Sequence, residues 1–384
     1  CFAPKSSYAA SEDAVRELKD MVKACHQAGI EVVLEMPFTE EVSKQMMEEC
    51  LRYYMIEYHI DGFILNPQIA PMTAIYADPI LKKTKIMVHQ IDFQTVMRRF
   101  LKGDEGMVES VMYWLKHISG KDGIFNCIAN QNGFTLQDMV SYDRKHNEMN
   151  GEHNQDGPEY NYSWNCGAEG PTRKRAIMGL RNRQMRNAFF LLLLAQGTPC
   201  ILAGDEFGNS QKGNNNVYCQ DNPVGWTDWS RLEKNQELHD FVKKLIGIRK
   251  AHPVFWPREE MCGIDQMSCG VPDVSYHGEN AWRAPSEVFS RQLGVYYSGA
   301  VVGGEDCFVA YNMHWIEHSF ALPALSRKKK WYKIASTEEG ILESAELLEN
   351  QRMVALRERT VMIIVGREEH GEKKGKARAD IVSA

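Results

Sequence analysis

The sequence predicts an α/β protein in which a parallel sheet is followed by a smaller antiparallel domain. Short apolar runs alternate with amphipathic stretches of helical period as far as residue 251. Strands that alternate with helices are typical of a parallel α/β sheet. After His252-Pro253 the pattern changes to short segments separated by turn residues, which predicts antiparallel strands.

The first predicted helix begins after Ser11, which is its expected cap, and ends at Gly29. Acidic residues at positions 12 and 13 suit the positive end of the helix dipole. The expected apolar stripe consists of Val15, Leu18, Val22 and Cys25. Residues 30–35 then form a continuous apolar run with β-branched side chains, which predicts a buried strand of a parallel sheet.

The rest of the parallel region follows in order. Strands are predicted over 62–66, 85–89, 124–129 and 199–203, and helices over about 41–58, 93–101, 107–117, 175–196 and 238–251. Together with 30–35 this makes about five parallel strands. The antiparallel region that follows is predicted to contain strands over 292–297, 307–312, 319–322, 331–334, 353–356 and 361–365.

Composition limits the classes of function. A chain of 384 residues with 43% hydrophobic residues can bury a large core and is long enough for two domains. The formal net charge of −6 gives no reason to expect a nucleic acid or an anionic membrane as a partner. The ten cysteines form no Cys-x-x-Cys pair, so we expect reduced thiols and no metal site. Reduced thiols are typical of a cytoplasmic protein, which is the expected localisation. There is no Gly-rich phosphate loop, so no nucleotide or other cofactor is expected.

The stretch 195–229 narrows the function further. An apolar strand leads into the turn 204–208 and then into a polar loop that carries amides, carboxylates and aromatic rings. These groups are suited to gripping a sugar, since amides and carboxylates bond hydroxyl groups and rings stack on the sugar face. A solvated loop rich in turn formers is the alternative interpretation.

This region resembles the eighth-strand region of isoamylase-type glycogen debranching enzymes of glycoside hydrolase family thirteen, the α-amylase family. The similarity continues upstream and covers roughly residues 2–320; its motifs include Asn132-Gly133-Phe134-Thr135-Leu136, Lys145-His146-Asn147-Glu148 and Ser163-Trp164-Asn165-Cys166-Gly167. The resemblance implies that residues 1–256 form an incomplete (β/α)₈ TIM barrel, from after the second strand to the last helix. Residues 257–366 would be the C-terminal β-sandwich, and the charged segment 367–384 a disordered tail.

The same resemblance locates the family's catalytic positions. Retaining glycoside hydrolysis requires a nucleophilic carboxylate and an acid/base carboxyl group roughly 5 Å apart. In Asp61-Gly62-Phe63-Ile64-Leu65-Asn66 the nucleophile position holds Asn66. In the next strand the acid/base position holds His89, or Gln90 if the register is shifted by one residue. The stabilising Asp of the family is replaced by Asn132. We therefore expect no intact catalytic residue.

The residues expected to contact the glucan lie on the loops that retain the resemblance. They are Gln131, Trp164, Asn165, Asp205, Glu206, Asn215, Asn216, Tyr218 and Asp221. The rings of Trp164 and Tyr218 are either stacking platforms or core aromatics. Glu35, Glu40, Asp92, Asp205 and Glu206 are the carboxylates near the expected strand ends that could replace the lost ones, although loop carboxylates are usually solvated or hydrogen-bonded.

Three hypotheses follow. The first is a catalytically inactive, isoamylase-like protein of α-glucan (glycogen or starch) metabolism that binds glucan or serves as a regulatory subunit beside an active debranching enzyme. The second is an active α-1,6-glucan hydrolase with relocated carboxylates. The third is a non-functional fragment, since the resemblance implies that the family's N-terminal region lies outside this chain.

Overall fold

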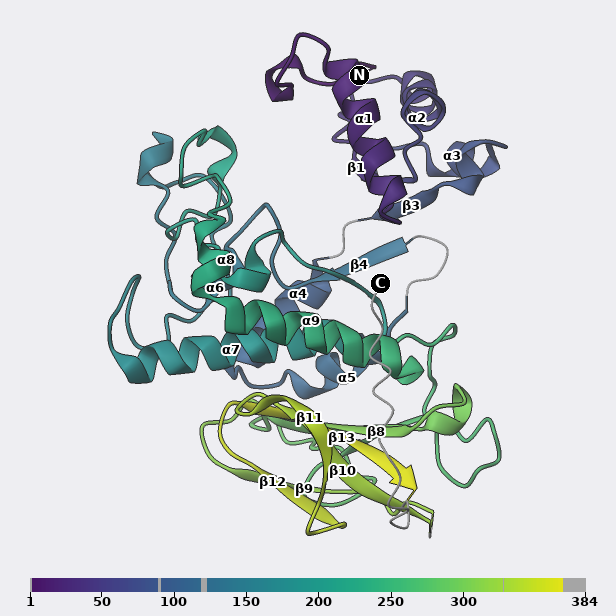
Figure 1. The fold of residues 1–384 in the computed structure, drawn as a ribbon, viewed down its shortest axis with the longest axis vertical. Helices are drawn as coiled ribbons and strands as arrows, with labels where there is room; N and C mark the ends of the chain where they lie inside the picture. Colours follow the sequence, from purple (N-terminus) through teal and green to yellow (C-terminus); the bar gives the residue numbers. More distant parts are fainter. Residues whose placement is uncertain (1, 89–90, 119–122, 327, 369–384) are drawn as a thin grey trace. The chain divides into compact units, whose positions relative to one another are not determined.

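The computed structural model describes residues 2–88, 91–118, 123–326 and 328–368, and divides the chain into two compact units. The first unit comprises residues 1–94, 117–127 and 197–200; the second comprises residues 95–116, 128–196 and 201–384. Figure 1 draws both units and labels most of their helices and strands. Within the described residues, no helix is both long and apolar enough to cross a membrane.

The first unit contains a parallel sheet of five strands in the order β1-β2-β3-β4-β5. Its strands are β1 (Val33–Glu35), β2 (Gly62–Leu65), β3 (Lys85–Val88), β4 (Gly123–Cys127) and β5 (Thr198–Cys200). The helices of this unit are α1 (Ala14–Gln27), α2 (Lys44–Tyr58) and α3 (Met72–Ala77). Parallel strands in sequential order, connected by helices, form part of a (β/α)₈ barrel, as predicted.

The core of the first unit lies between the helices and the sheet. Phe63 and Leu65 of β2 are buried against Leu51 and Tyr54 of α2 and against Ile75 of α3. Burying each such side chain contributes about 1.5–3 kcal/mol. Because these elements bury one face, their apolar residues recur with the period of a helix or a strand. That spacing made most of the elements predictable from the sequence.

Two details of the first unit differ from the predictions. The cap of α1 is Asp13, whose side chain accepts a hydrogen bond from the backbone N–H of Arg16 at 3.0 Å; the predicted cap Ser11 is wrong. The strand β1 is shorter than the predicted 30–35 and is not buried, and Ile30 is largely exposed. Because β1 is an edge strand of the described sheet, it has a neighbour on one side only.

The second unit combines helices with two antiparallel sheets. Its helices are α5 (Val108–Lys116), α6 (Leu136–Met139), α7 (Arg175–Leu193), α8 (Ser230–Lys234) and α9 (Gln236–Ala251), together with most of α4 (Asp92–Lys102). Phe190 of α7 and Phe241 of α9 meet edge to face, with ring centroids 5.3 Å apart. These two helices lie side by side in Figure 1.

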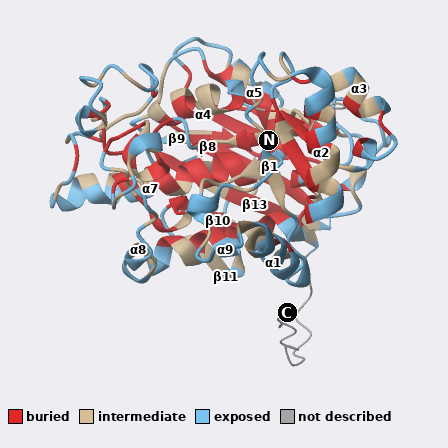
Figure 2. Ribbon diagram, turned by 90° about the horizontal axis from the view of Figure 1, so that it is seen from above, coloured by how far each residue is buried: buried red, intermediate tan, exposed pale blue. Residues whose placement is uncertain are grey.

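The antiparallel strands form the predicted β-sandwich. The larger sheet has the order β11-β10-β13-β8-β7-β6, and β12 pairs with β9 in a second sheet. The bounds are β6 (Val274–His277), β7 (Gln292–Tyr297), β8 (Asp306–Asn312), β9 (His318–Ala321), β10 (Lys329–Ser336), β11 (Gly340–Leu347), β12 (Met353–Leu356) and β13 (Thr360–Glu368). The core between the sheets includes Phe308, Phe320, Trp331 and Ile364, and the central strands β8, β10 and β13 are buried in Figure 2.

The elements α3, α6, α8, β6 and β11 were not predicted. The strand β11 has no fully buried residue, so it lacks the apolar alternation that marks a half-buried strand. The predicted strand 199–203 ends at residue 200 as β5, and the predicted helix 175–196 ends at Leu193. The predicted domain boundaries at 256 and 366 stay predictions. Residues 369–384 of the expected tail lie outside the described residues.

Candidate functional site

The polar loop that follows β5 is fixed to the helix α6 by two buried aspartates. Gly204 begins the turn at a φ of 98°, where a Cβ would lie 2.7 Å from the Cβ of Asn209, so only glycine fits there. The next residue, Asp205, accepts a hydrogen bond from the backbone N–H of Leu136 at 2.9 Å. Asp138 accepts one from the Ser210 hydroxyl at 2.5 Å. The start of the loop therefore has a defined position.

Burial changes the proton affinity of both carboxyl groups. It raises the pKa of Asp205 to about 8, against the opposing effects of the Leu136 hydrogen bond and the Arg98 charge. Burial also raises the pKa of Asp138, although Ser210 and backbone N–H groups oppose this. Asp205 is only 4% exposed. A buried carboxyl group that already holds a backbone N–H is suited to fixing the loop.

A network of buried amides holds the middle of this loop against the segment 147–161. Asn147 donates from Nδ2 to Oδ1 of Asn215 at 2.8 Å. Asn215 in turn donates from Nδ2 to the Pro158 carbonyl oxygen at 2.8 Å and to Oδ1 of Asn161 at 2.9 Å. Both N–H groups and the oxygen of the Asn215 side chain are thus used inside the protein.

The network extends through a second group of polar side chains. Asn150 and Asn216 both donate from Nδ2 to Oδ2 of Asp156, at 2.7 and 2.8 Å. Asn214 and Gln220 both donate to Oδ1 of Asn150, each at 2.8 Å. The hydrogen bond from Asn150 is the main cause that lowers the pKa of Asp156. We call the side chains of Asn147, Asn150, Asp156, Asn161, Asn214, Asn215, Asn216 and Gln220 the amide network.

One glycine is required where the two chain segments meet. At Gly157, with a φ of 73°, a Cβ would lie 2.4 Å from Oδ1 of Asn215 and 2.9 Å from Nδ2 of Asn147. Any other residue would displace both amides as well as strain the backbone. The close approach of the two segments is therefore built into the sequence at this position.

Exposed aromatic rings surround the amide network. Tyr218 is 76% exposed, Tyr160 is 79% exposed and Trp226 is 55% exposed. Trp226 donates from Nε1 to Oδ1 of Asp221 at 3.0 Å, which restricts the orientation of its ring. Large aromatic rings exposed on a fixed polar loop are suited to stacking on the apolar face of a sugar. Because its ring is exposed, Tyr218 is not a core aromatic residue. Of the two interpretations given above, the stacking platform remains.

The other predicted glucan-contacting residues have varied surroundings. Trp164 is half-buried, and the guanidinium of Arg359 lies 4.9 Å from its ring centroid. Asn165 donates from Nδ2 to Oε2 of Glu169 at 3.1 Å. Glu206 accepts a hydrogen bond from the backbone N–H of Gly204 at 2.9 Å. These side chains brace the loops, and their contact with glucan stays a prediction.

Of the three positions expected to have carried catalytic groups, the two that the structure describes belong to different units. Asn66 follows β2 in the first unit, is exposed, and accepts a hydrogen bond from the backbone N–H of Gln68 at 3.0 Å. Asn132 belongs to the second unit, beside Gln131, and both are exposed. His89 lies outside the described residues.

The carboxylates considered as replacements are also spread over the chain. Glu35 ends β1, Glu40 is exposed in the loop that follows it, and Asp92 begins α4, all in the first unit. Asp205 and Glu206 belong to the second unit and are engaged by backbone N–H groups. Among the described residues, no group of three or more His, Cys, Asp or Glu side chains could hold a metal ion.

Several residues of the site were not predicted. They are Asp138, Asn147, Asn150, Asp156, Asn161, Tyr160 and Trp226. Asn147 and Asn150 belong to motifs that resemble the family, so the density of asparagines in 147–161 was a usable signal. Their partners in the loop after β5, Asn215 and Asn214, lie 68 and 64 residues away, which no local pattern reveals.

Comparisons with known proteins agree with this fold. The chain is 28% identical to "Glycogen operon protein GlgX homolog" of Mycobacterium bovis, covering 88% of this chain and 62% of the relative. It is 29% identical to "Isoamylase 3, chloroplastic" of Oryza sativa, covering 88% and 54%. It is 32% identical to "Glycogen debranching enzyme" of Erwinia tasmaniensis, covering 66% and 51%. No family model matches the sequence.

The structure of a type I pullulanase from Bacillus subtilis, complexed with maltose, superimposes with a TM-score of 0.68 at 17% identity. The superposition covers 95% of this chain and 58% of the pullulanase. The chain spans between half and two thirds of the length of the curated relatives it matches. The chain is thus similar in sequence to proteins named isoamylase and glycogen debranching enzyme, and similar in fold to a pullulanase.

Proposed function

We propose that this chain binds α-glucan on the loops around the amide network and does not hydrolyse it at the rate of its relatives. In this role it is a glucan-binding or regulatory subunit in glycogen or starch metabolism, beside an active debranching enzyme. The observation that supports it best is the combination of a rigid amide network with exposed rings at Tyr218, Trp226 and Tyr160.

The rigidity of the loop favours binding. An oligosaccharide loses conformational freedom when it binds, so a protein surface that is already ordered loses less. Asn215 and Asn216 use their amides to hold the loop in place, and the rings remain available to a ligand. We therefore assign the amides a positioning role and the rings the direct contact with the sugar.

The chemistry of the former catalytic positions favours an inactive site. An amide such as Asn66 or Asn132 is neutral, so it can neither attack the anomeric carbon nor stabilise an oxocarbenium-like centre by charge. Asp205 is not a suitable replacement, because it is buried and bonded to the backbone of Leu136. Removing the groups of a catalytic unit leaves at most activity that is lower by several orders of magnitude.

The test compares binding with cleavage in the same sample. A branched maltooligosaccharide is titrated into the full chain by calorimetry, and reducing ends are then assayed. We expect saturable binding without new reducing ends. Release of linear chains at the rate of an active debranching enzyme would instead support the alternative of relocated carboxylates, and it would refute the proposal.

A further inference from the structure

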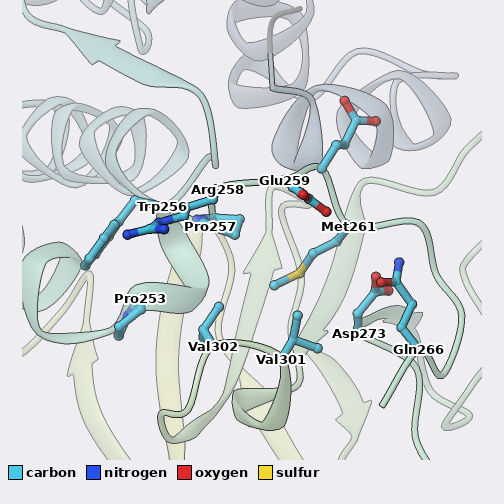
Figure 3. Close-up of a pocket in the computed structure, with 11 residues that line it drawn as sticks. Pro253, Trp256, Pro257, Arg258, Glu259, Met261, Gln266, Asp273, Val301 and Val302 are labelled. Atoms are coloured by element: carbon cyan, nitrogen blue, oxygen red, sulfur yellow. The ribbon is translucent and has the colours of Figure 1, made fainter. Parts of the chain in front are cut away.

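A cavity of about 520 Å³ lies in the second unit beyond the end of α9, apart from the amide network. Its size falls in the range of about 300–1,000 Å³ that is usual for small-molecule sites. Figure 3 shows the side chains that line it. They are Pro253, Trp256, Pro257, Arg258, Glu259, Glu260, Met261, Gln266, Asp273, Val301 and Val302.

The chain that enters this cavity is held firmly on its N-terminal side. The guanidinium of Arg249, at the end of α9, donates to the Leu193 carbonyl oxygen at 2.7 Å. Gln196 donates from Nε2 to the Val254 carbonyl oxygen at 3.0 Å, and Val254 itself is fully buried. The ring of Trp256 follows two residues later and is 47% exposed. A large ring is therefore presented to solvent from a fixed turn.

The other end of the segment is held as well. Lys116 donates from Nζ to the Met261 carbonyl oxygen at 3.1 Å and forms an ion pair with Glu260 at 3.2 Å. Asp273 accepts hydrogen bonds from the backbone N–H groups of Cys262 and Gly263 at 2.9 and 2.7 Å. Residues 257–260 thus connect two fixed points, which limits the positions their side chains can reach.

Two charged side chains of this segment are not engaged by the protein. Within the described part of the chain, Arg258 and Glu259 form no hydrogen bond or ion pair with another side chain, although both line the cavity. Arg258 lies on the same side of the cavity as Trp256 in Figure 3, and the base is formed by apolar side chains such as Val301 and Val302. A donor-only group and an acceptor-only group thus face a partly apolar space.

We propose that this cavity is a second glucan site that takes one or two glucose units of a maltooligosaccharide. A phosphate or other anion would be repelled by the carboxylates of Glu259, Glu260 and Asp273, which outnumber the guanidinium of Arg258 in the lining. A neutral sugar can use both groups through its hydroxyls while its C–H face covers the Trp256 ring. This inference rests on the proposed function for the glucan as ligand, and uses none of the residues of the amide network.

The experiment uses the full chain labelled with 5-fluorotryptophan, in which Trp→Phe variants assign the fluorine resonances. Trp256 reports on the cavity, Trp226 reports on the loop around the amide network, and the 49% exposed Trp282 is the matched control. Maltotriose is the probe, and inorganic phosphate is the anionic control. We expect saturable shifts of Trp256 and Trp226, no shift of Trp282, and no effect of phosphate on Trp256.

Variants then test the chemistry of the cavity. Arg258→Ala is expected to weaken the maltotriose response of Trp256 by about tenfold, and Glu259→Gln by about threefold, since charged groups form the stronger hydrogen bonds. The Tyr218→Ala variant is expected to weaken the maltotriose response of Trp226 by about tenfold and to leave the Trp256 response intact. Circular dichroism confirms that each variant folds.

The outcomes separate the two proposals. If Trp226 responds to maltotriose and Trp256 does not, the second site is refuted and the proposed function stands. If Trp256 stops responding in the Tyr218→Ala variant, or responds to phosphate and not to maltotriose, the second site is likewise refuted. If neither tryptophan responds, both proposals fail.

Discussion

At the scale of single residues, the buried Asp205 determines how the loop responds to pH. Its pKa is raised from 3.8 to about 8 by burial, so the folded protein binds a proton there that the unfolded chain releases above pH 4. The resulting contribution to stability is complete below about pH 4 and is lost as the pH rises to about 8. This is the direction expected of an acid that is more easily protonated when the protein is folded.

The variant Asp205→Asn isolates this effect, because the amide oxygen can still accept the hydrogen bond from Leu136. We expect equal free energies of unfolding near pH 4, and a variant that is more stable than the parent by at least about 1 kcal/mol near pH 8. Denaturant titrations at the two pH values measure the difference. A difference that does not change with pH would show that Asp205 is ionised in the folded protein.

Tyr218 is the residue whose ring should matter most for glucan. We expect Tyr218→Ala to weaken maltotriose binding by about tenfold, which is the loss of roughly one aromatic contact. The free energy of unfolding should not change, because the ring is 76% exposed. Tyr8→Ala removes an equally exposed ring in the other unit and is the control. Equal affinities of the two variants would remove Tyr218 from the site.

At the scale of structural elements, the amide network is the feature that orders the loop. Asn215→Ala removes a hydrogen bond from each of three partners: the Pro158 carbonyl oxygen, Oδ1 of Asn161, and Nδ2 of Asn147, which keeps its bond to the Asp156 carbonyl oxygen. We expect a loss of about 2–4 kcal/mol in the free energy of unfolding, since buried polar groups are costly to leave unpaired.

Limited proteolysis gives a second readout of the same variant. Cleavage within residues 209–229 should become faster in Asn215→Ala, because the loop then opens without global unfolding. Asn280→Ala replaces an exposed asparagine and serves as the control. If the rate of cleavage within this loop is the same in Asn215→Ala as in the parent, the other members of the amide network are sufficient to hold the loop.

A second group of polar interactions connects the end of α9 to the β-sandwich. Glu305 of the loop before β8 accepts a hydrogen bond from His252 at 3.2 Å and is paired with Arg367 of β13 at 2.7 Å. The His252 hydrogen bond and the Arg367 charge lower the pKa of Glu305 from 4.5 to about 2, although partial burial opposes them. This carboxylate therefore stabilises the folded protein above about pH 4.5, and its contribution is lost as the pH falls to about 2.

We expect Glu305→Gln to reduce the free energy of unfolding by about 1 kcal/mol at pH 7, a value that allows for the partial exposure of this carboxylate. The cost should decline as the pH falls toward 2, where about half of the parent carboxylate is protonated. Glu343→Gln, on the exposed side of β11, is the matched control. A cost that does not decline would contradict the ionic origin of the effect.

At the scale of the whole molecule, the architecture could be predicted because a helix or strand that packs against the core places apolar residues at regular intervals along the sequence. The five parallel strands and most of the sandwich strands were predicted, since β2 and β8 are continuous apolar runs. The strand β11 was missed because its residues remain partly exposed, and Asp13 was overlooked as a cap because two capping residues lie close together.

The site was harder to predict than the fold for a physical reason. Composition and resemblance located the loop and one of its rings, Tyr218, which is exposed as a stacking platform requires. The role of Asn215 depends on Asn147 and Asn161, which are 68 and 54 residues away in sequence. A side chain that positions a loop cannot be distinguished from one that contacts a ligand until the long-range partners are known.

The central claim is that the chain binds α-glucan without cleaving it, and one paired measurement tests it most directly. A branched maltooligosaccharide is titrated into the purified chain by calorimetry, and the same sample is assayed for new reducing ends. We predict saturable heat and no increase in reducing ends beyond that of a protein-free control. Reducing ends that accumulate at the rate of an active debranching enzyme, or an absence of binding heat, would contradict the claim.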